Sequence, residues 1–183
     1  GKIIGEIRAL KNLSLKIERG QIFGFLGRNG AGKTTTIKCL MGILSPDRGK
    51  IEIDGISIHK FPIEVKQKIG YVPEKIGLYE RFTPLEIVEY LGRFHQIEGD
   101  KLRDRAKELF EIFGLERQLE KRIEYLSMGL KKRVALVCSL INNPELLVLD
   151  EPMSGLDPES TVALRESLIR LNKKGLTIFL SSH

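Results

Sequence analysis

Residues 27–34 read GRNGAGKT and satisfy the phosphate-binding loop pattern G-x-x-x-x-G-K-[ST] at every fixed position. Glycines at 27, 30 and 32 allow the backbone to turn with its N–H groups pointing inward, where they can surround a phosphate. A helix that starts near Gly32 would direct its positive end at the same anion. The stretch therefore predicts a site that holds the phosphates of a nucleotide.

The residues around this loop have the order that the motif requires. An apolar run over 21–26 suits a buried strand, and apolar residues recur at helical spacing over 34–44. Lys33 is expected to reach the β- and γ-phosphates, and the Thr34 hydroxyl to ligate the Mg²⁺ that accompanies the nucleotide. The residues expected to contact the nucleotide here are Gly27, Arg28, Asn29, Gly30, Ala31, Gly32, Lys33, Thr34 and Thr35.

Composition limits the class of protein without choosing a partner. The 183 residues are 42% hydrophobic, enough for one sizeable core, and the net charge of +6 suits solubility, a phosphate ligand or an anionic surface equally well. No apolar run approaches the roughly 20 residues that cross a bilayer, and no signal peptide opens the chain. We expect Cys39 and Cys138 to be buried thiols in a reducing compartment, and the chain to be a C-terminally truncated excerpt of a longer protein.

Hydrophobic periodicity predicts alternating strands and helices. The strands are expected over 9–18, 21–26, 69–74, 146–149 and 176–182, with a hairpin over 50–58 that turns at Asp54-Gly55. The helices are expected over 34–44, from Thr83-Pro84 onward, over about 102–113, from Ser127 to Asn143, and over 158–171. This alternation predicts an α/β fold: a P-loop NTPase (RecA-like) core with a mainly parallel sheet, an N-terminal antiparallel β part and a helical insert. We expect one domain over 1–183, with a core lobe from 1–74 plus 144–183 and a helical subdomain over 75–143.

Ligands of such sheets bind at the carboxyl ends of the strands, and the polar residues of interest occupy those ends. The phosphate loop follows Leu26, Asp150 and Glu151 follow the apolar strand 146–149, and His183 follows the last strand, so these segments are expected to converge. Asp150 is the expected holder of Mg²⁺. Glu151 is the expected general base that polarises the attacking water, although two adjacent acids at a strand end are also compatible with a simple turn.

The order of the motifs resembles the nucleotide-binding domain of ATP-binding cassette (ABC) ATPases. It runs from the phosphate loop through a helical insert to LSMGLKKRV, LLVLDEP, SGLD and a final histidine, and it covers nearly the whole chain. IGYVPE and GLYERFTPLEIVEYL are similar to the exporter branch, which includes drug-efflux and ABC-2-type ATPases. The resemblance implies that Ser127 and Gly129 touch the γ-phosphate of ATP held by a second subunit, in a head-to-tail dimer. It also implies that Asp157 lies at the dimer interface and that His183 contacts the γ-phosphate.

Some positions depart from the family pattern. Met128 and Leu130 replace a glycine and a glutamine of the signature loop, and Glu74 occupies the place of a glutamine that senses Mg²⁺ and couples to the transmembrane partner. Glu74 is still expected to ligate magnesium. Ile4 stands where an aromatic residue usually stacks on adenine, so the adenine contact is expected to be apolar.

The resemblance implies an ATP-hydrolysing subunit that drives a membrane transporter, with export as the expected direction. ATP and Mg²⁺ are the implied cofactors, and a second ABC subunit (in a homo- or heterodimer) and a transmembrane permease are the implied partners. The chain would be cytoplasmic and peripheral on the inner face of the membrane, and no nucleic acid is expected. One alternative is a soluble ABC ATPase that acts on ribosomes or DNA. Another is a GTPase or small-molecule kinase, but the guanine-reading N-K-x-D is missing at 172–175, which reads NKKG.

Overall fold

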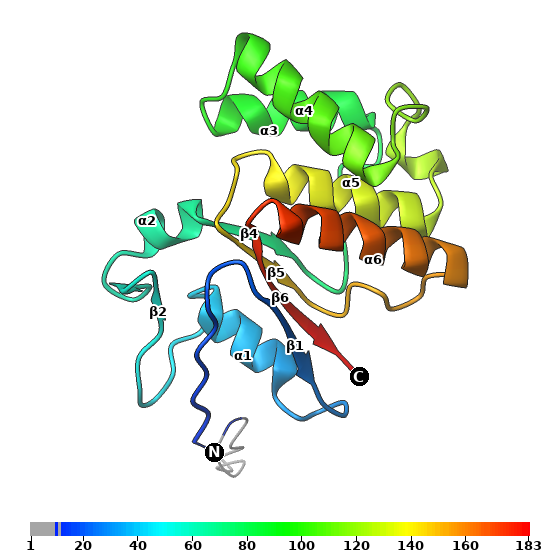
Figure 1. Ribbon diagram of the computed structural model, residues 1–183. Helices are drawn as coiled ribbons and strands as arrows, with labels where there is room; N and C mark the ends of the chain where they lie inside the picture. Colours follow the sequence, from blue (N-terminus) through cyan, green and yellow to red (C-terminus); the bar gives the residue numbers. More distant parts are fainter. Residues whose placement is uncertain (1–9, 11) are drawn as a thin grey trace, which may run out of the picture.

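A parallel sheet of four strands in the order β1-β6-β5-β4 lies at the centre of the structure, a computed structural model that describes residue 10 and residues 12–183 (Figure 1). The strands are β1 (Ile22–Leu26), β4 (Ile69–Val72), β5 (Leu146–Leu149) and β6 (Thr177–Ser182). Neighbouring strands are all parallel, with Leu26 opposite Ser182 and Leu149 opposite Leu180. The predicted α/β fold with a mainly parallel sheet is confirmed.

Helices cover both faces of this sheet, which explains the continuous apolar runs over residues 146–149 of β5 and 178–180 of β6. On one face, Val148 and Phe179 pack with α1 (Lys33–Leu40), α2 (Pro62–Gln67) and the neighbouring hairpin. On the other face, Leu147, Leu149 and Ile178 pack with α5 (Met128–Leu140) and α6 (Pro158–Lys173). Figure 1 shows α1 on one side of the sheet and α5 and α6 on the other. Among the described residues, no helix combines the length and apolarity that a membrane span requires.

The predicted hairpin is present but shorter than expected. It pairs β2 (Glu52–Ile53) with β3 (Ile56–Ser57) in antiparallel register. Asp54 and Gly55 have φ values of 52° and 76°, and positive φ at both central residues is the conformation that a tight primed turn needs.

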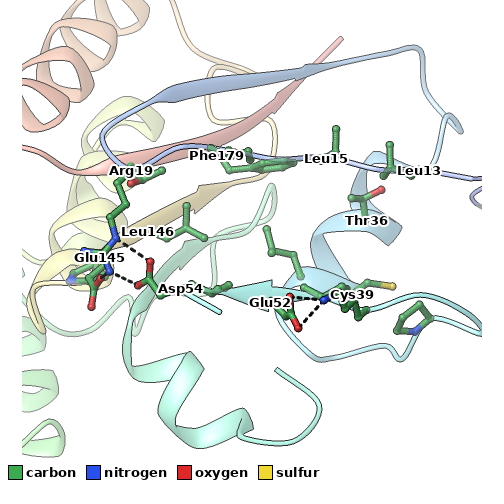
Figure 2. A pocket seen from close by; sticks show the side chains of 18 of the residues that line it. Leu13, Leu15, Arg19, Thr36, Cys39, Glu52, Asp54, Glu145, Leu146 and Phe179 are labelled. Carbon is green, nitrogen blue, oxygen red and sulfur yellow. Dashed lines mark hydrogen bonds and ion pairs between the residues drawn. The ribbon is translucent and has the colours of Figure 1, made fainter. Parts of the chain in front are cut away.

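The strand predicted over 9–18 is wrong for the described part of that segment. Residues 10 and 12–18 adopt no strand, and Leu13 and Leu15 are 43% and 44% exposed. The segment borders a hollow of about 1780 Å³ that Thr36, Cys39 and other residues also line (Figure 2). Alternating polarity marks a face, but a strand also needs a neighbour that takes up its backbone hydrogen bonds, and no described strand lies alongside. Among the described residues, the antiparallel part is the hairpin alone.

Charged side chains tie the hairpin turn to the amino ends of β4 and β5. Arg19 Nη2 lies 2.9 Å from Asp54 Oδ2 and 3.1 Å from Glu145 Oε2 (Figure 2). Lys68 Nζ lies 2.8 Å from Glu145 Oε1 and 3.7 Å from Asp54 Oδ2. This network lies at the opposite end of the strands from the predicted site.

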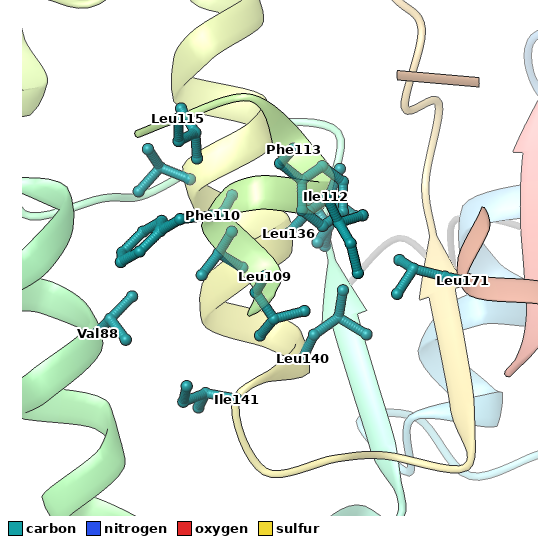
Figure 3. Packing of buried hydrophobic residues seen from close by; sticks show 14 of the residues in the cluster. Val88, Leu109, Phe110, Ile112, Phe113, Leu115, Leu136, Leu140, Ile141 and Leu171 are labelled. Carbon is teal, nitrogen blue, oxygen red and sulfur yellow. The ribbon is translucent and has the colours of Figure 1, made fainter. Parts of the chain in front are cut away.

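The helical insert begins with α3 (Pro84–Phe94) and continues with α4 (Gly99–Phe113) and a short 3-10 helix (Ile123–Tyr125). Thr83 and Glu86 form a reciprocal capping box at the start of α3. Gly114, with φ 61°, is the C-cap of α4, which ends at Phe113 as the predicted range 102–113 requires. Buried apolar side chains join α4 to α5 and to α6; Figure 3 labels Leu109, Phe110, Phe113, Leu136, Leu140 and Leu171 among them. Because the same cluster includes Leu147 and Leu149 of β5, one continuous core joins the insert to the sheet. The division into two lobes stays a prediction.

Candidate nucleotide-binding site

The phosphate loop joins β1 to α1 in a tight turn. Gly30 and Gly32 have φ values of 82° and 88°, a conformation that glycine adopts without strain. The Ala31 amide donates to the Arg28 carbonyl at 3.1 Å, and a Cβ atom at Gly27 would lie 3.3 Å from Ala31 Cβ. Gly32 is the N-cap of α1 and offers no side chain to the first-turn amides. These N–H groups are therefore open to an anion.

Lys33 lies inside the curve of this loop and is only 7% exposed. Its Nζ donates to the carbonyl oxygens of Gly27 and Arg28, and it lies 3.2 Å from Glu151 Oε1. The predicted phosphate-binding cation and the predicted base, which are far apart in sequence, are therefore in direct contact.

Glu151 connects the loop to the end of β6. Its Oε2 lies 2.9 Å from His183 Nδ1, while its other carboxylate oxygen faces Lys33. Burial alone would raise the pKa of this carboxyl, but the contacts with His183 and Lys33 outweigh burial and hold the pKa below its usual value. Glu151 is therefore ionised at neutral pH, as a general base must be.

Ser181 orients both acids, and sequence reasoning missed it. Its hydroxyl is fully buried, donates to Asp150 Oδ1 at 2.7 Å and accepts from the Glu151 amide at 2.9 Å. The available signal was a serine that follows the apolar run over residues 178–180, two residues before His183. The strand order was needed to reveal the contact, because β6 lies directly beside β5.

Two of the predicted magnesium ligands, Asp150 and Thr34, lie at the edge of the sheet where the phosphate loop begins. Asp150 is buried and Thr34 is exposed beside the loop, so a carboxylate and a hydroxyl are available, both hard oxygen donors. Within residues 10 and 12–183, no group of three or more His, Cys, Asp or Glu side chains forms a ready metal site. The carboxylate of Asp150 and the hydroxyl of Thr34 have the donor chemistry of Mg²⁺ sites, in which one or two protein oxygens act together with the phosphates of the substrate.

Glu74 lies at the same edge of the sheet but outside the Lys33 cluster. It follows β4, whose neighbour is β5, and the Asp150 amide donates to the Val72 carbonyl at 3.0 Å. Its side chain is exposed. Thr35, the last residue predicted to contact the nucleotide, is half-buried and also lines the hollow beside α1, which the other described site residues do not line. Ile4 lies outside the described residues.

The signature loop stands apart from the phosphate loop of the same chain. Ser127 is the exposed N-cap of α5, and its Oγ accepts from the Leu130 amide at 3.3 Å. Gly129 is buried against Ser160 of α6. In the described part of the chain, no hydrogen bond joins Ser127 or Gly129 to residues 27–35. The structure therefore does not bring these two predicted halves of a site together within one molecule.

Asp157 and Lys132 fix the chain that follows the two acids. Asp157 is the N-cap of α6 and accepts from the Ser160 amide at 2.7 Å; the Ser160 hydroxyl and amide hold the pKa of Asp157 below its usual value. Lys132, on α5, is buried and donates to the carbonyl oxygens of Pro152 and Ser154 at 2.8 and 2.6 Å. Sequence reasoning gave Lys132 no role.

The phosphate loop follows β1, two acids follow β5, and a histidine follows β6, which lies between β1 and β5 in the sheet. This arrangement defines a P-loop NTPase of the ATP-binding cassette class. Comparison with known proteins identifies the family. The ABC transporter family model matches residues 10–154, and the chain belongs to that family.

Relatives and solved structures agree with this assignment. The chain is 37% identical over its whole length to a linearmycin resistance ATP-binding protein of Bacillus subtilis, and 38% identical to a bacitracin transport ATP-binding protein of Bacillus licheniformis. It spans 58% and 59% of those two proteins, respectively. A dimeric ATP-binding cassette in a post-hydrolysis state, bound to ADP and phosphate, aligns with a TM-score of 0.83 at 29% identity, over 96% of this chain and 80% of that one.

Proposed function

We propose that this chain is the ATP-binding and ATP-hydrolysing subunit of an ABC transporter, and that ATP-driven dimerisation powers substrate export. The observation that carries the proposal is the position of Glu151, whose carboxylate lies 3.2 Å from Lys33 and 2.9 Å from His183 at the same sheet edge as the phosphate loop. A buried, ionised carboxylate beside a phosphate-binding cation is suited to the activation of water next to a terminal phosphate.

The chemistry follows from these positions. The loop amides and Lys33 bind the β- and γ-phosphates, and Glu151 accepts the proton of a water molecule that attacks the γ-phosphorus. The bond from that phosphorus to the bridging oxygen breaks, and ADP and phosphate leave. His183 holds the Glu151 carboxylate and, by the family resemblance, faces the γ-phosphate. Thr34 and Asp150, with Glu74, would hold Mg²⁺, whose charge offsets that of the phosphates.

A second ABC subunit would complete each site. Ser127 and Gly129 stand at the N-terminus of α5, where helix dipole and free amides favour an anion. Since neither residue bonds to the phosphate loop of its own chain among the described residues, a head-to-tail partner, identical or homologous, would supply them to ATP. The similar cassette that was solved as a dimer with ADP and phosphate supports this arrangement.

The names of the relatives support a transporter that exports its substrate. They describe linearmycin resistance, bacitracin transport and, for another relative at 37% identity, Nod factor export. The subunit would lie on the cytoplasmic face of the membrane and attach to a transmembrane permease. Residues 75–143 would contact the permease, with Glu74 at the hinge, and Ile4 would make an apolar contact with adenine.

Replacement of the proposed base tests this function. Glu151→Gln keeps the size of the side chain but removes the proton acceptor, so ATP turnover should fall by about a hundredfold or more. ATP binding should persist, and an ATP-bound dimer should accumulate in size-exclusion chromatography. Glu145→Gln, at the other end of the same strand, is the matched control and should turn over ATP at the wild-type rate. Unchanged turnover in Glu151→Gln would refute the assignment of the base.

A further inference from the structure

Lys132 is a buried cation on α5, 5% exposed, whose ammonium group faces the backbone of the chain after β5. Its Nζ lies 3.4 Å from the Glu151 carbonyl oxygen, 2.8 Å from that of Pro152 and 2.6 Å from that of Ser154. An ammonium group has three N–H donors, so these carbonyls use its full capacity. The chain that follows β5, residues 151–154, therefore folds around the ammonium group of Lys132.

Burial of this charge is costly, and no carboxylate salt bridge to Lys132 offsets it among the described residues. Burial lowers the pKa of Lys132, while the nearby charges of Glu74 and Glu151 act in the opposite direction. A well-packed apolar residue often gives equal or greater stability in place of a buried ion. Stability alone therefore does not account for a lysine at position 132.

The backbone conformation of Glu151 indicates what Lys132 does. Glu151 has a φ of 48°, in the left-handed region that a non-glycine residue occupies only when its surroundings hold it there. The Ser181 hydroxyl accepts from its N–H at 2.9 Å, and Lys132 faces its carbonyl oxygen and the next carbonyls along the chain. Both sides of the strained residue are thus fixed from separate elements, β6 and α5.

We propose that Lys132 is a positioning residue for Glu151. It holds the carbonyl oxygens of residues 151, 152 and 154, and thereby keeps the Glu151 carboxylate within reach of Lys33 and His183. The inference rests on the proposed role of Glu151 as the base. A cavity of about 10 Å³ beside Lys132, lined by Pro73, Pro152 and other residues, is at the lower limit for one water molecule, so water would not readily replace the ammonium group.

Lys132→Met tests the proposal in the full-length protein, because methionine keeps an unbranched side chain and removes the donors. Since a small displacement of a catalytic group is costly, kcat for ATP should fall about tenfold to a hundredfold. The KM and the affinity for a fluorescent ATP analogue should stay within about twofold, because Lys132 does not contact the phosphate loop. Lys132→Gln, which retains N–H donors, should recover part of the rate.

Lys131→Met is the matched control. Lys131 is the preceding residue of α5, and its Nζ pairs with the exposed Glu80 at 2.9 Å. Its replacement should leave kcat unchanged. Melting temperatures of all variants separate a loss of folding from a loss of positioning.

A double mutant distinguishes positioning from a general structural effect. If Lys132 acts through Glu151, Lys132→Met should cause no further loss of turnover in the Glu151→Gln background. A wild-type kcat in Lys132→Met, or an equal loss in both backgrounds, would overturn the inference while leaving the base intact. Wild-type turnover in Glu151→Gln alone would instead remove the proposed base, and this inference with it.

Discussion

Gly129 lies so close to Ser160 that a Cβ atom on the glycine would be 2.6 Å from Ser160 Oγ and 3.0 Å from Ser160 Cβ. This contact joins the N-terminal turns of α5 and α6. The glycine is therefore needed for packing, whatever it also contributes to ATP binding.

Gly129→Ala should destabilise the fold, because the added methyl group must push the two helices apart. We expect the free energy of unfolding to fall by about 1–3 kcal/mol in urea titrations. In a Ser160→Gly background the methyl group has more room, so the same change should cost less. An equal cost in both backgrounds would show that the contact with Ser160 is not the cause.

Gly70→Ala should be among the most damaging glycine substitutions in the sheet. A Cβ at Gly70 of β4 would lie 2.3 Å from the Ser139 carbonyl oxygen of α5, and a helix backbone cannot yield as a side-chain tip can. We expect a loss of about 3 kcal/mol or more in the free energy of unfolding.

Gly24 provides the control for this prediction. It lies in β1 of the same sheet, and no described atom would lie within 4 Å of a Cβ there. Gly24→Ala should therefore change stability by less than about 0.5 kcal/mol. Equal losses at the two positions would refute the account of how α5 packs on β4.

Ser127→Ala and Thr83→Ala separate helix capping from ATP-driven association. Each hydroxyl caps a helix, with Oγ to amide distances of 3.3 Å at Ser127 and 3.2 Å at Thr83. Each alanine variant should lose about 1 kcal/mol of stability or less. Only Ser127→Ala should weaken the ATP-dependent dimer, measured by analytical ultracentrifugation. Equal dimerisation of the two variants would contradict the proposed contact with the partner's ATP.

Asp54→Asn should weaken the network around the hairpin turn in a pH-dependent manner. Burial alone would raise the pKa of Asp54, but the positive charges of Arg19 and Lys68 hold that pKa below its usual value. A lowered carboxyl pKa adds stability above the unfolded value of about 3.9, and that stability is lost as the pH falls through the folded value. At pH 7 the free energy of unfolding of Asp54→Asn should be lower than that of the wild type by at most about 1 kcal/mol, because the Arg19–Asp54 ion pair is partly exposed.

This difference should narrow as the pH falls below about 4 and as salt is added. Asparagine tolerates the positive φ of 52° at this position, so the turn itself should persist. A difference that does not change with pH would indicate a conformational cause and not an electrostatic one. Thermal unfolding between pH 3 and pH 7 measures it.

Sequence reasoning succeeded where local signals decide the structure. The start of a helix at Thr83-Pro84, the end of the next helix at Phe113 and the Asp54-Gly55 turn are set by neighbouring residues, and each was predicted. The rule that ligands bind at the carboxyl ends of parallel strands was enough to group the phosphate loop with Asp150 and Glu151.

It failed where distant residues decide the structure. The alternation of apolar and polar residues over 12–18 indicates which side chains share a face, but it does not identify a neighbouring strand with which the segment could pair. Helix α2 was not predicted, because its six residues are too few to show a helical period and it has no side-chain cap. The contacts of Ser181 and Lys132 depend on which elements lie side by side, which no local pattern encodes.

The position of β6 between β1 and β5 affects how the chain folds as it is synthesised. Ile22 of β1 pairs with Ile178 of β6, so about 150 more residues must be synthesised after β1 before its partner strand exists. Until then β1 lacks the strand beside it, and the Gly27 amide lacks the Ser182 carbonyl to which it donates at 3.1 Å. Long-range pairings of this kind form slowly. A nascent chain that has not yet formed β6 should therefore be unable to capture a nucleotide, so ligand-dependent stabilisation would begin only when translation has passed residue 182.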